Sequence, residues 1–198
     1  MCMATSRVSA LLERAQAGDL RAFEELVQPH VGRLYSYIAR MVCDPVEAED
    51  LTQEVVLRAH RAINSFRGGA TFQTWLYRIA TNITVDAIRR RKRHASRLCS
   101  LDDPLPGTDG SMAREVPDTQ LTPAEQVERG ELCGEVLGAI GELSPKLRAV
   151  VVLFDLEGCT YEEIAEVLRL PLGTVKSRLF NARARLRDRL KPYVEGYA

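Results

Sequence analysis

Residues 160–189 constrain the fold of this chain most, because two helical patterns meet there across a short break. Thr160 can cap the first helix, and Glu163, three residues later, can bond back to the amide of the cap. We expect this helix to span residues 161–168. Pro171 lacks an amide donor and is tolerated only in the first turn of a helix, so a second helix must begin near it. The segment therefore predicts a helix-turn-helix.

The second helix of this motif combines a regular apolar stripe with seven cations. The stripe consists of Val175, Leu179, Ala182, Leu186 and Leu190, which recur at helical spacing and predict one buried face. Such a helix fits the DNA major groove, with base contacts near its N-terminus and phosphate contacts further along. A merely solvated basic surface is the alternative. The candidate duplex-DNA contacts are Thr174, Lys176, Ser177, Arg178, Phe180, Asn181, Arg183 and Arg187.

A glycine-containing loop at residues 65–72 precedes a long helical pattern that extends through Arg93. Paired glycines allow a loop to approach a ligand closely, and Thr71 can cap the following helix. The run 89–93 consists of five cations, which also favour a helix C-terminus for purely structural reasons. Cations beside aromatic residues and a small-residue loop suit single-stranded nucleic acid. We expect Trp75 to lie mainly in the core.

The remaining periodicities predict an all-α fold of two small helical domains joined by a flexible acidic linker. Helices are expected over residues 7–17 and 20–42, and after Asp44, where Glu47 can complete a capping box. Residues 97–121 are rich in turn formers and form the predicted linker. The domains are then residues 1–96 and 122–198. Further helices should start after Thr122 and Ser144, and no stretch alternates long enough for a sheet.

Charge distribution and cysteine usage narrow the functional class. The net charge is zero, but residues 1–98 carry +5, residues 99–135 carry −7 and residues 136–198 carry +2. The five scattered cysteines lack metal-site or disulfide spacing, so we expect no metal, no other cofactor and reduced thiols.

No signal peptide or membrane span is evident, which predicts a cytoplasmic protein without membrane contact. No catalytic constellation is present, so an enzyme is not expected.

Three motifs in order and spacing resemble the extracytoplasmic-function sigma factors, group IV of the sigma-70 family. Residues 66–82 look like their region 2.3, residues 173–179 look like region 4.2, and residues 48–59 are similar to region 2.2. The resemblance covers roughly residues 20–93 and 122–190. It implies that region 2 occupies the first domain and region 4 the second.

The resemblance also implies partners and site residues. Region 2 would dock on the beta-prime clamp helices of core RNA polymerase through Asp50, Leu51, Gln53, Glu54, Leu57 and Arg58. It would melt the minus-10 promoter element and trap its bases. The expected contacts there are Phe66, Arg67, Gly68, Gly69, Ala70, Thr71, Phe72, Trp75, Arg78, Asn82, Arg89, Arg90, Arg91, Lys92 and Arg93. Region 4 would contact the beta flap and recognise the minus-35 duplex, and an anti-sigma factor is the expected regulator.

Two positions depart from the family pattern. Asn181 stands where members often carry a cation, and Gly69 stands where a polar or acidic loop residue is common. Both departures bear on which promoter sequence is recognised. The alternative function is a helix-turn-helix transcriptional regulator that is not a polymerase subunit, although such proteins more often carry a dimerisation or ligand domain.

Overall fold

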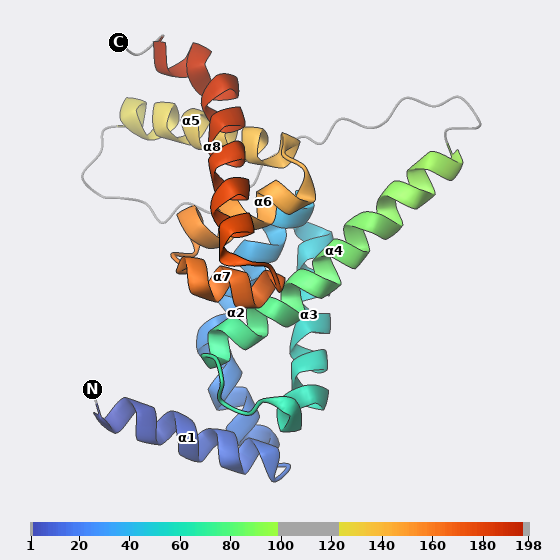
Figure 1. Ribbon diagram of the computed structural model, residues 1–198, viewed down its shortest axis with the longest axis vertical. Coiled ribbons are helices and arrows are strands. Elements are labelled where there is room, and N and C mark those ends of the chain that lie inside the picture. Colours follow the sequence, from blue (N-terminus) through green and yellow to red (C-terminus); the bar gives the residue numbers. More distant parts are fainter. Residues whose placement is uncertain (1, 99–122, 196–198) are drawn as a thin grey trace.

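Ten helical segments and no strand make up residues 2–98 and 123–195, the part of the chain that the computed structural model describes (Figure 1). This confirms the predicted all-α class. The predicted linker begins in the last turn of α4, and its residues from 99 onward lie outside the described part.

The N-terminal unit consists of α1 (Cys2–Gln16), α2 (Leu20–Val42), α3 (Pro45–Ala62), the short 3-10 helix η1 (Ile63–Ser65) and α4 (Phe72–Leu98). Local signals in the sequence explain the helix starts. Asp19 accepts a hydrogen bond from the amide of Ala22, and Asp44 accepts from the amides of Val46 and Glu47. The helices pack with α2 against α1, α3 and α4. Helix α2 continues through Pro29 without interruption.

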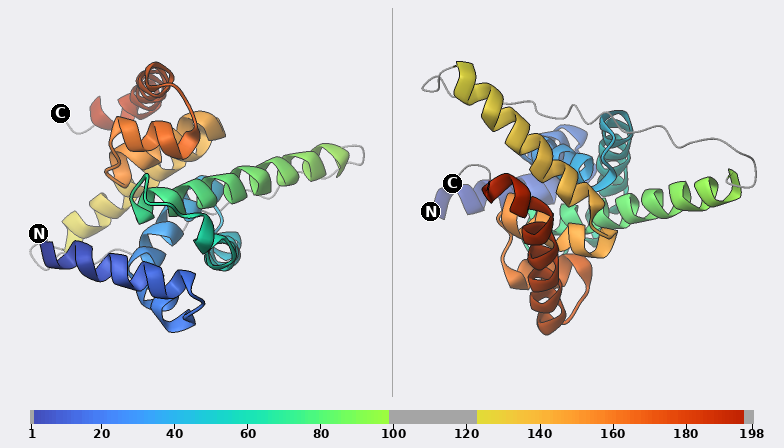
Figure 2. Two further views of the ribbon diagram at one scale, coloured as in Figure 1. Left: turned by 60° about the horizontal axis from the view of Figure 1, so that its bottom comes forward. Right: turned by 90° about the horizontal axis from the view of Figure 1, so that it is seen from above.

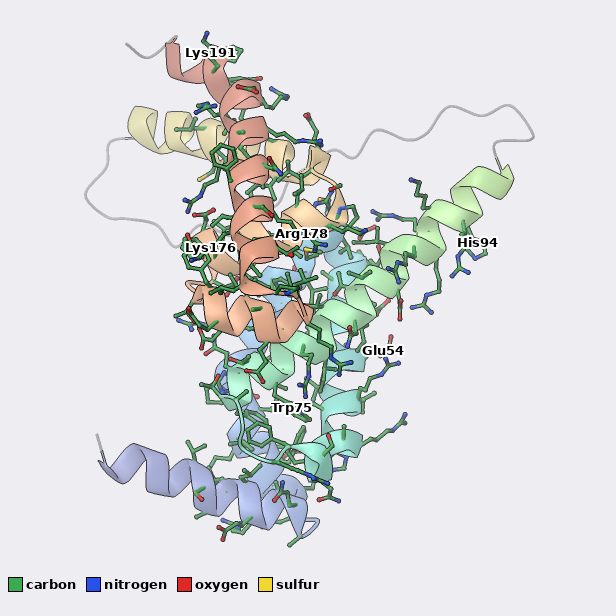
Figure 3. The ribbon with its side chains drawn as sticks, viewed as in Figure 1. Glu54, Trp75, His94, Lys176, Arg178 and Lys191 are labelled. Atoms are coloured by element: carbon green, nitrogen blue, oxygen red, sulfur yellow. The ribbon has the colours of Figure 1, made fainter. Side chains whose placement is uncertain are left out.

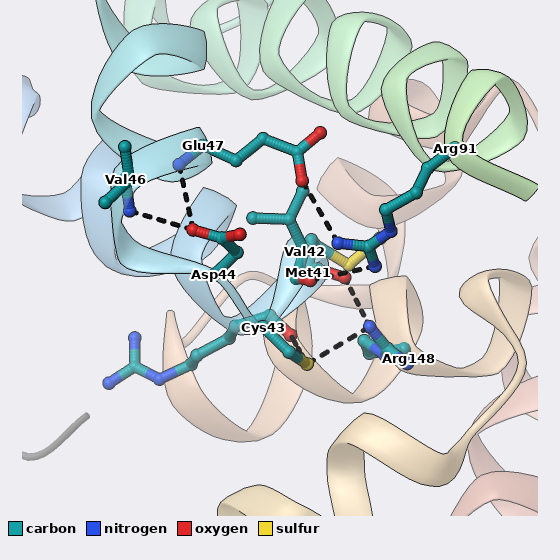
Figure 4. Close-up of polar contacts among 9 residues, drawn as sticks. Met41, Val42, Cys43, Asp44, Val46, Glu47, Arg91 and Arg148 are labelled. Carbon is teal, nitrogen blue, oxygen red and sulfur yellow. Dashed lines mark hydrogen bonds and ion pairs between the residues drawn. The ribbon is translucent and has the colours of Figure 1, made fainter. Parts of the chain in front are cut away.

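The capping box expected at the start of α3 is wrong for its second bond, the one from the backbone amide of Asp44 to the carboxylate of Glu47. The Glu47 carboxylate pairs instead with Arg91 of α4 at 3.1 Å, and the Arg91 guanidinium also donates to the carbonyl of Val42 at 3.1 Å (Figure 4). Arg91 thereby places a cation at the C-terminal end of α2, where the helix dipole favours positive charge. A long-range ion pair competes successfully here with a local contact that sequence spacing alone suggested.

The C-terminal unit consists of α5 (Pro123–Glu142), α6 (Pro145–Val151), the π-helical turn η2 (Val152–Leu156), α7 (Tyr161–Leu168) and α8 (Leu172–Glu195). Helix α7 has the predicted bounds, and both bonds of its capping box form between Thr160 and Glu163. The turn to α8 passes through Arg169, a C-cap in the left-handed conformation with φ 52°. Helix α8 packs on α5, α6 and α7.

The two units lie against each other, which the sequence did not predict. Figures 1 and 2 show α7 alongside the first half of α4, and α5 and α6 near the end of α2, in agreement with the contacts between these helices. The last turns of α4 project beyond the other helices of both units (Figure 2). Buried residues from both units form one continuous core cluster.

Arg148 of α6 forms one of the polar contacts between the units. Its side chain is 8% exposed and donates to the carbonyls of Ile140, Gly141 and Leu143 at the end of α5. It also donates to the carbonyl of Met41 at the end of α2 and lies 3.4 Å from the Cys43 sulfur (Figure 4). A single guanidinium therefore satisfies the C-terminal carbonyls of two helices from different units, where the helix dipoles favour a cation.

Glu157 forms the second polar contact between the units. Its side chain, 5% exposed, accepts a hydrogen bond from the Tyr77 hydroxyl at 2.8 Å and pairs with Arg40 at 3.2 Å. Burial, followed by the bond to Glu157, raises the pKa of Tyr77 well above its usual range. The carboxylate therefore keeps a neutral donor and a cation as partners across the interface.

Candidate nucleic-acid and polymerase interfaces

The loop between η1 and α4 has the geometry expected of a preformed binding loop. Gly68 adopts φ 76°, a left-handed conformation that favours glycine. Thr71 caps α4, since its hydroxyl accepts from the amide of Thr74 at 3.1 Å. Arg67, Gly68, Gly69 and Thr71 are exposed, and Ala70 is half-buried. The loop therefore presents a small-residue surface with one cation.

The aromatic residues that flank this loop differ from the expectation. Phe66, Phe72 and Trp75 are all buried and pack on one another, with ring centroids 5.5–5.6 Å apart. His30 of α2 contacts Phe72 at 5.7 Å. Figure 3 shows Trp75 inside the N-terminal unit, at the loop end of α4. The rings offer no open face to a base in this structure, so they support the loop, and the expected core role of Trp75 is confirmed.

One face of α4 carries a polar stripe away from the loop. Arg78, Asn82, Arg89 and Arg93 recur at helical spacing along it. Asn82, Arg89, Arg90, Lys92 and Arg93 are exposed, whereas Arg78 is half-buried. Arg91 binds Glu47 and the end of α2, and Arg89 lies 3.7 Å from the carboxylate of Asp86. The stripe and the loop are two candidate surfaces for a nucleic-acid strand, and both belong to the segment from residue 67 to residue 93.

Helix α8 presents the outward face that the sequence predicted. Lys176, Ser177, Phe180, Asn181, Arg183 and Arg187 are exposed, Thr174 and Arg178 are half-buried, and Val175, Leu179 and Ala182 are buried. Phe180 is 74% exposed and therefore does not pack on a neighbouring helix. Figure 3 shows Lys176 in the first turns of α8, beside α7.

Two aromatic rings form cation–π contacts with cations of α8. The Lys176 ammonium lies 5.7 Å from the centre of the Tyr161 ring, and the Arg183 guanidinium lies 5.1 Å from that of Phe154. Arg183 also forms an ion pair with Asp155, and the hydrogen bond raises its pKa. The stacked rings of Phe154 and Tyr161, 4.7 Å apart, belong to η2 and α7. These contacts restrain the two cations on the outward side of α8.

The outer face of α3 forms a third exposed surface. Asp50, Gln53 and Arg58 are exposed, Leu57 is 58% exposed, and Glu54 pairs with Arg58 at 2.8 Å. Leu51 is 6% exposed and packs in the core, so in this structure it supports the outer face of α3 and does not form part of it. Val46 is also exposed and lies on the same face of α3 as Gln53, two turns nearer the start of the helix. An apolar and acidic surface of this kind suits a protein partner better than DNA.

Sequence reasoning missed the residues that join the two units. No motif of the sequence connects Tyr77 with Glu157, or Arg148 with the end of α2. Partners such as Tyr77 and Glu157 are 80 positions apart, so no local spacing connects them. The one available signal was an isolated Arg148 inside an apolar run, which indicates a buried cation with dedicated acceptors.

Cys159 provides a pH-dependent test of the packing between the units. The thiol is buried, and burial together with the carboxylates of Glu163 and Glu157 raises its pKa to about 12, from 9.0 for an exposed thiol. The contribution that the neutral Cys159 thiol makes to the free energy of unfolding is therefore complete below pH 9, and it is lost as the pH rises toward 12. Between pH 9 and 11, we expect the free energy of unfolding to fall more steeply than in Cys159→Ala, by about 1 kcal/mol per pH unit.

Urea denaturation at a series of pH values measures this difference. Tyr37 and Tyr77, whose pKa values burial also raises, titrate in both proteins, and the Cys159 thiolate raises both values further. The difference between the two stability curves therefore measures the titration of Cys159 together with its coupling to these two hydroxyls. Parallel stability curves for the two proteins would show that the Cys159 thiol is not protected.

No candidate metal site or membrane-spanning helix occurs in the described part of the chain. Among residues 2–98 and 123–195, no three side chains of the His, Cys, Asp and Glu types are grouped to hold an ion. None of the helices there has the length and apolar character needed to cross a bilayer.

Comparison with known proteins identifies the family. The sigma-70 region 2 model matches residues 26–94, and the sigma-70 region 4 model matches residues 133–186. The sigma-H factor of Pseudomonas aeruginosa is 37% identical over 186 residues, covering 92% of this chain and 93% of that protein. The extracytoplasmic-function factor SigW of Bacillus subtilis is 36% identical over 181 residues, covering 91% and 95%.

Solved structures show the same fold. CnrH, solved with the cytosolic domain of CnrY, has a TM-score of 0.63 and 25% identity, with 94% of this chain and 98% of that chain covered. The sigma factor RpoE of Bartonella quintana, solved with the anti-sigma factor NepR, has a TM-score of 0.68 and 23% identity, covering 87% and 98%. The chain therefore belongs to the extracytoplasmic-function sigma factors of the sigma-70 family, which direct RNA polymerase to promoters.

Proposed function

We propose that the three exposed surfaces divide the work of promoter recognition. The outer face of α3 docks on the beta-prime clamp helices of core polymerase. The loop of residues 67–71 and the polar stripe of α4 bind the unpaired strand of the minus-10 element. Helix α8 recognises the minus-35 duplex. The observation that supports this division is the simultaneous exposure of all three surfaces on a chain of this family.

The chemistry of each surface fits its proposed ligand. The α4 stripe and α8 present cations for phosphates, and the loop has two glycines that leave room for an extruded base. Phe180 lies beside Asn181, so the same turn of α8 offers an apolar contact for a thymine methyl and an amide for a base edge. Capture of unpaired bases offsets an unstacking cost of a few kcal/mol per base, which explains why one domain both melts and recognises.

We also propose an anti-sigma factor as the regulator of this chain. The family resemblance implies such a partner, and CnrH was solved with a protein domain bound to it. The beta flap of the polymerase is the proposed contact of the C-terminal unit. We propose that the chain consists of two domains, residues 1–96 and 122–198, each of which contains one of the two matched segments.

Replacing Leu57 with glutamate tests the docking surface. Leu57 is 58% exposed on α3, and a buried charge in an interface core costs several kcal/mol, so affinity for core polymerase should fall by about 100-fold. Fluorescence anisotropy with labelled protein and purified core enzyme measures this. The matched control is Leu20→Glu, since Leu20 is 54% exposed and lies at the start of α2. Equal affinities for both variants would contradict the assignment of α3.

A further inference from the structure

The end of α1 is held rigidly against the start of α2. Gly18 adopts φ 97°, and the amide of Asp19 bonds to the carbonyl of Arg14 at 3.0 Å. The Arg14 guanidinium reaches the Asp19 carboxylate with two nitrogens, at 3.0 and 2.6 Å, while the other carboxylate oxygen caps α2. Side chains at the last turn of α1 therefore project from a fixed position.

Gln16, the last residue of α1, connects this corner to the base of the loop. Its side-chain nitrogen donates to the carbonyl of Ile63 at 3.2 Å and to the carbonyl of Phe66 at 2.9 Å. A glutamine amide has two donor hydrogens, and both are used here. The two acceptors are 47 and 50 positions away in sequence and mark the start of η1 and its C-cap. The side chain is half-buried, which protects these bonds from water.

We propose that Gln16 is a positioning residue for the minus-10 loop, an inference that rests on the proposed function of that loop. The carbonyl of Phe66 is the last backbone group before Arg67 and the paired glycines. Glycines lose much conformational freedom when a loop is ordered, so an unanchored loop would bear that cost on binding DNA. Anchoring the loop beforehand removes part of this cost from the binding step.

The other contacts that hold the loop act at different points from the Gln16 side chain. The rings of Phe66 and Phe72 contact each other at 5.6 Å and hold the two ends together. Thr71 fixes the far end through its cap on Thr74. The near end has the weak 3-10 bond from the amide of Phe66 to the carbonyl of Ile63, at 3.1 Å, and the Gln16 amide joins both of these residues. Gln16 thus sets the direction in which the backbone leaves Phe66.

Two near-isosteric substitutions test this proposal. Gln16→Met keeps the shape and helix propensity but removes the donors, and Gln16→Glu also places a carboxylate against two carbonyl oxygens. In holoenzyme assembled from full-length protein and core polymerase, we expect about tenfold weaker binding of Gln16→Met to a single-stranded minus-10 oligonucleotide of the non-template strand. Gln16→Glu should bind more weakly still. Affinity for core polymerase and the thermal midpoint should stay near wild type.

Hydrogen exchange in the free protein gives a second readout that needs no DNA. The amides of residues 67–71 should exchange faster in both variants, whereas those in the middle of α4 should not change. Glu13→Gln, an exposed site on the same helix, is the matched control and should resemble wild type in both assays. This exchange pattern would support the proposal even if wild-type holoenzyme failed to bind the oligonucleotide, and that failure would count against the proposed function.

Two results would overturn the positioning role. Unchanged loop exchange together with unchanged oligonucleotide affinity in Gln16→Met would show that the bonds do not order the loop. Weaker core binding and a lower thermal midpoint in parallel with the loss of oligonucleotide affinity would show a general structural role instead.

Discussion

Replacing Arg148 with methionine is expected to lower the free energy of unfolding by about 3 kcal/mol. Methionine fills a similar volume but leaves the carbonyls of Ile140, Gly141, Leu143 and Met41 without their donor. These groups lie at the ends of two helices, where the supply of intrahelical donors ends, although the carbonyl of Ile140 also accepts from the amide of Leu143 at 3.2 Å. Urea denaturation measures the change, and the wild-type slope with denaturant should be retained if the fold is unchanged.

The control for this prediction is Arg185→Met. Arg185 lies on α8 of the same unit and is exposed, so its loss should change stability by no more than about 0.5 kcal/mol. Equal effects of the two substitutions would mean that the guanidinium of Arg148 is not a significant link between the units.

Replacing Lys176 with glutamate should reduce transcription from a minus-35-dependent promoter by about 100-fold. The side chain is exposed near the N-terminus of α8, where it is supported by Tyr161. Charge reversal removes an attractive contact with DNA and adds repulsion with phosphates. Run-off transcription with reconstituted holoenzyme measures the loss, and core binding should be unaffected because the site lies on a different surface from α3.

Lys146→Glu is the matched control for this substitution. Lys146 is exposed and has the same charge, but it belongs to α6 in the same unit and is not part of α8. A comparable loss of transcription in both variants would indicate a general electrostatic effect, and α8 would then lose its assigned role in recognition.

Local chemistry explains which parts of this fold could be predicted from sequence. The bounds of α2 and α7 agree with prediction because each has a cap within four residues of its start and a regular apolar stripe. The outward face of α8 was predicted for the same reason. In each case the signal is contained in one segment, and burial of the apolar stripe then fixes the orientation of the polar face.

Contacts between distant segments explain the errors. The aromatic side chains of Phe66 and Phe72 suggested rings on which bases could stack. In the structure, His30 and Trp75 pack on Phe72, and Trp75 also packs on Phe66. The packing of the two units depends on Arg148 and Glu157, whose partners lie up to 117 positions away. Which of these distant residues come into contact depends on the three-dimensional packing, and this cannot be predicted from the spacing of residues in the sequence.

Run-off transcription tests the central claim most directly. Purified core polymerase is compared with and without this protein on promoter fragments, including DNA upstream of its own coding sequence. The account predicts initiation that depends on the protein, starts at defined positions and is lost when minus-10 or minus-35 bases are changed. Correctly folded protein that neither binds core polymerase nor stimulates initiation on any fragment would contradict it.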